Sequence, residues 1–198
     1  MNSELSDSLR SLEKQLRRAG RAELLCHLSP GVPPAETRAA LASVGLGPSH
    51  ELERLYGWHD GSWWESGLTL GQKYLFPWFV FPPLGDATSS YSALMESGCW
   101  EPTWFPVFED GGGGYYVVDF GPAQFGAVRS VDEFPEQGVI EHRSLAAMAQ
   151  TLSAAYETGT FFVDAEGGLQ RDYDGFVELA GQLNPDVRWW HDSEYRSQ

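Results

Sequence analysis

The hydrophobic positions of the first sixty residues recur at helical spacing. A 4-3-4 stripe of leucines predicts a helix that ends at Gly20. The members of this stripe are Leu5, Leu9, Leu12 and Leu16. Because the stripe is narrow, it fits either a helix that lies on the domain, which is the commoner case, or a short coiled-coil seam. Proline at the first turn and glycine past the end predict a second helix from Pro33 to about Val44. Short helices over 22–28 and from Ser49 to His59 complete this part.

After residue 61 the pattern changes to that of strands. Aromatic and β-branched residues fill Tyr74–Phe81 and Thr103–Phe108, and each run contains one proline. Because proline cannot donate a hydrogen bond to a sheet ladder, each run predicts an edge strand or a strand bent at the proline. Tyr115–Phe120 follows a glycine-rich turn and predicts a hairpin with Trp104–Phe108, and Phe125–Val131 predicts the next strand.

The last third of the chain returns to helices. Ser144 predicts the N-cap of one helix, and a hairpin over 160–172 leads into a last helix that ends at Asn184. Between the strands we expect a loop over Pro82–Ser97, with a short helix near its end, and an acidic loop over Asp132–Glu141. Helices, a meander of strands and further helices predict an α+β fold. It has a central, mainly antiparallel sheet flanked by helices, with an N-terminal helical segment.

Length and composition fit one domain. The chain has 198 residues, 42% of them hydrophobic, which is enough to bury a core. We assign residues 1–198 to a single domain, with a helical extension over 1–31, a core over 33–183 and a tail over 184–198. No apolar run approaches the roughly 18–20 residues of a membrane span, and the charged N-terminus is unlike a secretory signal, which predicts a cytoplasmic protein. We expect Cys26 and Cys99 to be two buried thiols rather than a disulfide.

The net charge of −15 is unevenly distributed along the chain. Residues 1–60 carry seven basic and eight acidic side chains, whereas residues 61–198 carry six basic and twenty acidic ones. Such a surface repels phosphate backbones, so direct nucleic-acid binding is not expected. It attracts a basic protein partner and speeds the encounter with it. An acidic surface that serves only solubility is the equally weighted alternative.

Three sequence features, in this order and spacing, carry a resemblance to a known family. A predicted helix closes with Leu55-Tyr56-Gly57-Trp58-His59-Asp60-Gly61, then Leu75-Phe76-Pro77 leads to Pro82-Pro83-Leu84, and Trp104-Phe105-Pro106-Val107-Phe108 precedes Asp110-Gly111-Gly112-Gly113 and Tyr115-Tyr116-Val117-Val118-Asp119. Over about residues 33–180 the chain resembles the SUKH superfamily, in the branch of the yeast cell-wall-assembly regulators of the Smi/Knr type. Asp60 stands where that family more usually has Asn.

The resemblance implies an α+β fold and no catalytic activity, with no shared catalytic residues to transfer. Bacterial relatives are largely immunity proteins that bind and neutralise polymorphic toxins, and fungal relatives are scaffolds in cell-wall assembly. The first expectation is therefore a non-catalytic protein-binding module, an immunity protein that neutralises a cognate toxin. The alternative is a regulatory or glycan-linked scaffold in cell-wall synthesis.

Residue patterns that suggest chemistry have simpler structural interpretations. Residues 109–114 lack the Gly-Lys-Ser/Thr of a phosphate loop and predict a hairpin turn, with a calcium site as a weaker alternative. His59 and Asp60 are adjacent at a helix end, so their side chains diverge instead of forming one site. The five histidines show no metal-binding spacing, and carboxylate pairs are expected by chance in so acidic a chain. We predict no catalytic residue, no metal site and no cofactor.

Two adjacent tryptophans, Trp63 and Trp64, follow a helix end in a polar context. Exposed aromatic residues beside acids form hot spots of protein interfaces, although burial of at least one of the pair is an equal alternative. Trp78, Trp100 and Trp104 lie in strand-like segments and are expected in the core. The predicted partner-binding residues are Trp63, Trp64 and Glu65 as an anchor, with Glu109, Asp110, Asp132, Glu133 and Glu136 as an acidic surface for a protein partner such as a basic toxin domain. The sequence leaves the partner and the oligomeric state open.

Overall fold

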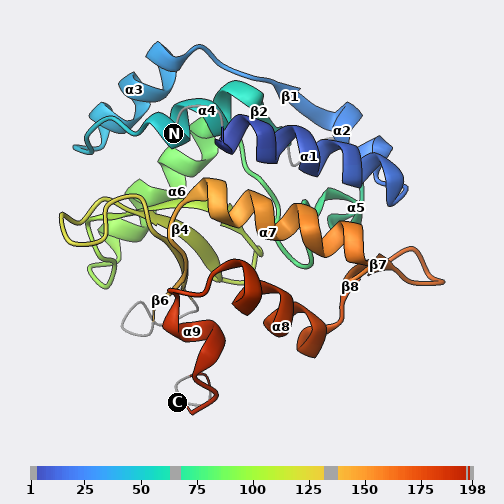
Figure 1. The fold of residues 1–198 in the computed structure, drawn as a ribbon. Coiled ribbons are helices and arrows are strands. Elements are labelled where there is room, and N and C mark those ends of the chain that lie inside the picture. Colours follow the sequence, from blue (N-terminus) through green and yellow to red (C-terminus); the bar gives the residue numbers. More distant parts are fainter. Residues whose placement is uncertain (1–3, 63–67, 132–137, 195, 197–198) are drawn as a thin grey trace.

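The computed structural model describes residues 4–62, 68–131, 138–194 and 196, and these residues form the predicted α+β fold (Figure 1). Helices from both ends of the chain surround an antiparallel sheet. In the described ranges, no helix has the length and apolar character needed to cross a membrane. The helices are α1 (Glu4–Arg18), α2 (Ala22–His27), α3 (Pro34–Ser43), α4 (His50–Trp58), α5 (Leu70–Lys73), α6 (Leu84–Glu96), α7 (Leu145–Thr158), α8 (Tyr173–Leu183) and α9 (Arg188–His191).

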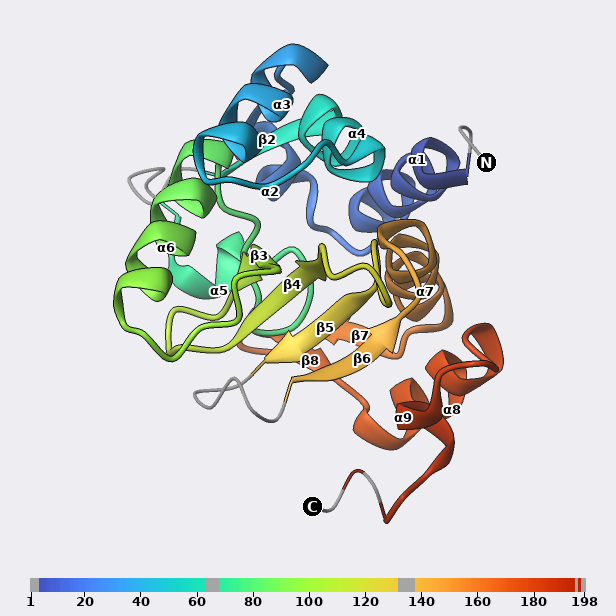
Figure 2. The ribbon, with the colours of Figure 1, turned by 90° about the vertical axis from the view of Figure 1, so that its left-hand side faces the viewer.

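The central sheet is an antiparallel meander of four strands in the order β3-β4-β5-β6. Figure 2 shows this sheet with α6 on the side of β3 and α7 on the side of β6. Two short two-stranded sheets accompany it, one made of β1 and β2 and one of β7 and β8. The strands are β1 (Leu28–Pro30), β2 (His59–Ser62), β3 (Trp104–Glu109), β4 (Tyr115–Asp119), β5 (Val128–Val131), β6 (Val139–His142), β7 (Phe161–Val163) and β8 (Leu169–Arg171).

Helix α1 packs along α7, and both views show the two helices side by side (Figures 1 and 2). Each leucine of the stripe that begins at Leu5 is at most 3% exposed, and Ser11 Oγ lies 2.8 Å from Ser153 Oγ across the helix pair. The helix therefore lies on the domain, as expected, and its leucines belong to one hydrophobic cluster that reaches Trp190. Because α7 covers the stripe, a coiled-coil seam with another chain is not available at these leucines.

Local signals at helix ends predict several boundaries correctly. The Ser144 side chain accepts a hydrogen bond from the N–H of Ala147 and caps α7. Asp172 caps α8 in the same way through the N–H of Gly175, and α8 ends just before Asn184. The hairpins β3–β4 and β7–β8 are also present as predicted.

Helix α6 and strand β6 differ from the prediction. The helix begins at Leu84 rather than near Ser90, so most of the expected loop over 82–97 is helical. Strand β6 occupies the end of the segment that we expected to be an acidic loop. The strand expected from Phe125 begins only at Val128, because the residues before it form turns.

The expected strand over Tyr74–Phe81 is a tight turn instead. The N–H of Phe79 donates to the carbonyl of Phe76 at 3.0 Å, with Pro77 and Trp78 at the corner. Trp78 is the third residue of this turn and has a φ of 71°. A type II turn has a positive φ at this position, and glycine is the usual residue there. The corner turns the indole outward, so Trp78 is 43% exposed and not in the core as predicted. Trp100 is buried and Trp104 is half-buried.

Both cysteines are free and exposed, so the expectation of buried thiols is wrong. Cys26 lies on the outer side of α2, whose buried positions are Leu24 and Leu25. Cys99 follows α6, just past the positive-φ residue Gly98, in a turn at the surface. Composition alone does not tell which side of a short helix or turn faces the core, so the general tendency of cysteine to be buried failed here.

Candidate functional site

The segments that carry the family resemblance meet where α4, β2 and α6 join. Asp60 Oδ1 accepts a hydrogen bond of 2.8 Å from the N–H of Leu84, the first residue of α6. Gly61 has a φ of 63°, and a Cβ at this position would lie 2.3 Å from the carbonyl carbon of Pro82. The N–H of Ser62 donates to the carbonyl of Phe81 at 2.9 Å. The helix-closing segment and the Pro-Pro-Leu segment are therefore one packed unit.

The third segment joins this unit through Val80 and Glu109. The N–H of Val80 donates to the carbonyl of Glu109 at 2.9 Å, and the N–H of Glu109 donates back at 3.2 Å. Glu109 is the last residue of β3, so the start of the glycine turn lies against the residues that precede α6. These hydrogen bonds hold together segments that are far apart in the sequence. Four residues in or next to these segments carry carboxylates.

We call these four carboxylates the acidic face: Asp60, Asp86, Glu109 and Asp110. They come from β2, the first turn of α6, the end of β3 and the turn that follows it, and all four are partly exposed. The charges of three of them, Asp60, Glu109 and Asp86, act on Tyr56, whose hydroxyl is buried and has no hydrogen-bond partner among the described residues. Burial raises the pKa of the Tyr56 phenol well above its ordinary value, and Asp60, Glu109 and Asp86 raise it further.

The carboxylates of the acidic face also repel one another. Burial raises the pKa of Glu109, and the charges of Asp86 and Asp110 add to the shift. Burial, Glu109 and Asp110 likewise raise the pKa of Tyr115. In the described part of the chain, no ion pair joins any of these four acids to a basic side chain. A cation placed here would relieve both the burial cost and the repulsion.

The glycine-rich segment is a hairpin turn, as predicted. Asp110 Oδ1 accepts hydrogen bonds from the N–H groups of Gly112 at 2.6 Å and Gly114 at 2.9 Å. Gly111 and Gly113 have φ values of 77° and 105°, which favour glycine. These contacts fix the direction of the Asp110 carboxylate, so the turn positions an acid and does not cradle a phosphate.

Two of the predicted partner-binding residues, Glu109 and Asp110, lie together on the acidic face. The predicted anchor and the other predicted acids lie outside the described residues; they are Trp63, Trp64, Glu65, Asp132, Glu133 and Glu136. The described residues that precede these two segments are Ser62 and Val131, and Val131 pairs with Tyr115, the partner of Glu109 in the hairpin. Sequence analysis missed Asp86, because it placed this residue in a loop, and it missed the contact of Asp60 with α6.

Two of the histidines, His59 and His142, make hydrogen bonds within the fold. His59 Nδ1 donates to the carbonyl of Ser29 at 3.1 Å, whereas Asp60 Oδ1 accepts from the N–H of Leu84. The two side chains therefore do not form one site, as expected. His142 is buried, bonds Asn184 at 3.3 Å, and has its pKa lowered by burial to about 4. Among the residues that the structure describes, no group of three or more histidine, cysteine or acidic side chains is arranged to hold a metal ion.

No protein-family model matches this chain, and no curated protein matches it.

Proposed function

We propose that this chain is a non-catalytic protein-binding module, and most concretely an immunity protein that neutralises a cognate toxin by occluding a basic domain of it. The acidic face is the proposed docking surface. The observation that carries the proposal is the gathering of four partly exposed carboxylates, Asp60, Asp86, Glu109 and Asp110, without a basic side chain paired to any of them in the described part of the chain. The resemblance to the SUKH superfamily favours the same function.

The physical argument concerns charge that the fold leaves uncompensated. Glu109 is held among like charges and is partly desolvated, which costs free energy in the isolated protein. Lysine or arginine side chains of a partner would offset this cost and form charge-assisted hydrogen bonds. Complementary potentials also raise association rates by roughly 10- to 1,000-fold at low salt. Binding of this kind blocks the toxin stoichiometrically and requires neither turnover nor a cofactor.

Growth rescue tests this proposal. The chain is coexpressed with a toxin encoded beside its gene, and the wild type is compared with a D86N/E109Q variant that removes two charges from the acidic face. We expect the wild type to restore growth and the variant to restore it less. Absence of a toxin-like neighbour, or equal rescue by both proteins, would count against the immunity function.

One observation favours the alternative, a glycan-linked scaffold in cell-wall synthesis. Trp78 and Tyr173 are 43% and 53% exposed, and the guanidinium of Arg171 lies 4.8 Å from the Trp78 ring and 5.3 Å from the Tyr173 ring. Exposed aromatic rings held in place can stack on the apolar faces of sugars. Trp78 also keeps a φ of 71° at a position where glycine is favoured, so this turn retains a large side chain at a conformational cost.

Titration with soluble glucan and peptidoglycan fragments separates the two functions. A glycan-linked scaffold gives a saturable response that W78G abolishes, because glycine adopts the same φ without strain and the turn is kept. No response from the wild-type protein, or a response that W78G leaves unchanged, removes this alternative and leaves the protein-binding function untouched.

A further inference from the structure

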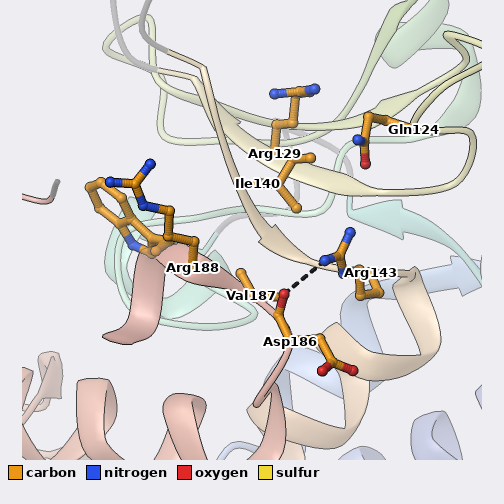
Figure 3. A pocket seen from close by; sticks show the side chains of 8 residues that line it. Gln124, Arg129, Ile140, Arg143, Asp186, Val187 and Arg188 are labelled. Atoms are coloured by element: carbon orange, nitrogen blue, oxygen red, sulfur yellow. Dashed lines mark hydrogen bonds between the residues drawn. The ribbon is translucent and has the colours of Figure 1, made fainter. Parts of the chain in front are cut away.

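A cavity of about 260 Å³ lies where the central sheet meets the C-terminal segment (Figure 3), and β6 at its wall is the edge strand opposite β3, which carries Glu109. β5, β6 and the segment from Asp186 through α9 form its walls. Its lining includes three arginines, one glutamine and three apolar side chains: Arg129, Arg143, Arg188, Gln124, Ile140, Val187 and Trp189. Such a volume lies slightly below the roughly 300–1,000 Å³ of pockets for drug-sized ligands, so it fits a small metabolite.

The concentration of positive charge here is unusual for this chain. Residues 61–198 contain only six basic side chains among twenty acidic ones, and three of those six line this one cavity. Asp186 also lines the cavity, but Figure 3 shows its carboxylate pointing away from Arg129 and Arg188. What Asp186 contributes toward Arg143 is its backbone carbonyl. Three of the four charged side chains that line the cavity are therefore cationic, and two of these, Arg129 and Arg188, are paired with the carboxylates of Asp119 and Asp192.

Arg129 is held rigidly at one wall. Its Nε donates to Asp119 Oδ2 at 2.8 Å, its Nη1 donates to the carbonyl of Gly138 at 3.1 Å, and its guanidinium carbon lies 5.1 Å from the Trp104 ring. Its Nη2 group makes no hydrogen bond to the described residues. A guanidinium fixed on two edges is preorganised, so little side-chain entropy is lost when its remaining donors bind a ligand.

Arg143 approaches from a second side. Its Nη2 donates to the carbonyl of Asp186 at 2.7 Å, which anchors the end of an otherwise exposed side chain. Arg188, from a third element, is ion-paired with Asp192 at 2.7 Å. Arginine forks match the oxygen spacing of phosphate and carboxylate groups, and guanidinium groups on three walls suit an anion with several charged oxygens.

We propose that this cavity binds the phosphate group of a small phosphorylated metabolite. Arg129 and Arg143 donate to the phosphate oxygens, Arg188 lies at the third wall with its charge paired to Asp192, and Ile140 and Trp189 contact the organic part. The net charge of −15 does not prevent this binding. At physiological ionic strength the Debye length is about 8 Å, so distant surface acids are screened while the arginines that line the cavity act at shorter range.

Isothermal titration at constant ionic strength tests this proposal with three probes: inorganic phosphate, glycerol 3-phosphate and acetate. We expect saturable binding of the phosphates, and acetate at least tenfold weaker because it has fewer charged oxygens. Tighter binding of glycerol 3-phosphate than of inorganic phosphate supports a monoester ligand, and the reverse order supports free phosphate as the ligand of the same site. Equal binding of acetate and phosphate would overturn the assignment.

Variants locate the binding. R143Q removes an exposed charge from the surface, so we expect it to fold and to bind phosphate roughly tenfold more weakly. R17Q removes one charge from exposed Arg17 on α1 and is the matched control, with unchanged affinity expected. Thermal unfolding checks that each variant is folded. No saturable phosphate binding by the folded wild type, or equal losses in R143Q and R17Q, would refute the site.

Discussion

Asp60 caps α6 from a distance: its carboxylate accepts a hydrogen bond of 2.8 Å from the N–H of Leu84, twenty-four positions further along the chain. The residue at the N-cap of this helix is Pro83, whose side chain cannot accept a hydrogen bond. The first N–H groups of a helix have no partner within it, so a carboxylate from elsewhere takes this role and interacts favourably with the helix dipole. This contact ties β2 to α6 and so places Asp60 and Asp86 on the same face.

Replacing Asp60 tests this cap. D60A leaves the N–H of Leu84 without its acceptor, so we expect it to lower the free energy of unfolding by about 1–2 kcal/mol. D60N keeps an amide oxygen in the same place and should lose less than half as much. Chemical denaturation of the three proteins measures both effects. Equal destabilisation by the two variants would mean that the charge of Asp60, and not its acceptor oxygen, stabilises the junction.

Gly61 makes the same junction sterically tight. In G61A the new Cβ would lie 2.3 Å from Pro82 and the backbone would keep a φ of 63°, so we expect a loss of about 3 kcal/mol or more in the free energy of unfolding. Gly45 is the matched control, since it has a φ of 80° and open space around it. G45A should cost only about 1–2 kcal/mol. Similar losses in the two variants would contradict the close packing of β2 against Pro82.

The leucine stripe of α1 is part of the core. Leu12 is 1% exposed, so L12A should lower the free energy of unfolding by roughly 2–5 kcal/mol, as expected for a cavity in a packed interior. Lys14 is exposed on the same helix, and K14A should change the stability by less than about 0.5 kcal/mol. A small effect of L12A in urea unfolding would show that α1 is a detachable element.

His142 gives the folded protein a dependence on pH. Its pKa is lowered by burial to about 4, below the ordinary 6.5, so between these values the unfolded chain binds more protons than the native protein. Stability from this group is present above pH 6.5 and is lost as the pH falls toward 4, by about 3 kcal/mol in all. Raised pKa values make Glu51 and Glu109 act in the opposite direction.

Comparison with H142Q isolates this effect, since Glu51 and Glu109 titrate in both proteins. Glutamine does not titrate, so any loss of the bond to Asn184 in H142Q is the same at every pH. Unfolding free energies measured from pH 7 to pH 4 should therefore fall more steeply in the wild type than in H142Q. Parallel pH profiles would mean that His142 is accessible to protons in the native state.

Elements with local signals were predictable from the sequence, and elements that depend on tertiary contacts were not. The leucine stripe of α1 and the N-cap at Ser144 can both be recognised from a short stretch of sequence. The start of α6 is rich in serine and threonine, which are weak helix formers, and their hydroxyls bond carbonyls four residues back, as from Thr88 to Leu84 and from Ser92 to Thr88. That helix is also capped by Asp60, which no local pattern reveals.

The same distinction holds for the candidate sites. Glu109 and Asp110 could be proposed from sequence because they adjoin a visible turn, whereas Asp86 joins them only through the fold of α6. Arg129 and Arg143 lie far from Arg188 in the sequence, and only the packing of α9 against β6 brings them to one cavity. The outward position of Trp78 was also hidden, because its turn uses a backbone conformation that tryptophan rarely adopts.

The central claim is that the acidic face attracts a basic protein partner, and the rate of association measures it most directly. The proposed toxin partner, purified as a single domain, is mixed with the wild type, with D86N/E109Q/D110N, and with the control E157Q/D174N/E178Q, which removes three exposed acids from α7 and α8. At low salt we expect the first variant to associate at least tenfold more slowly, the control to stay within about twofold, and added salt to remove the difference. Equal rates for the two variants, or no complex with the wild type, would contradict the account.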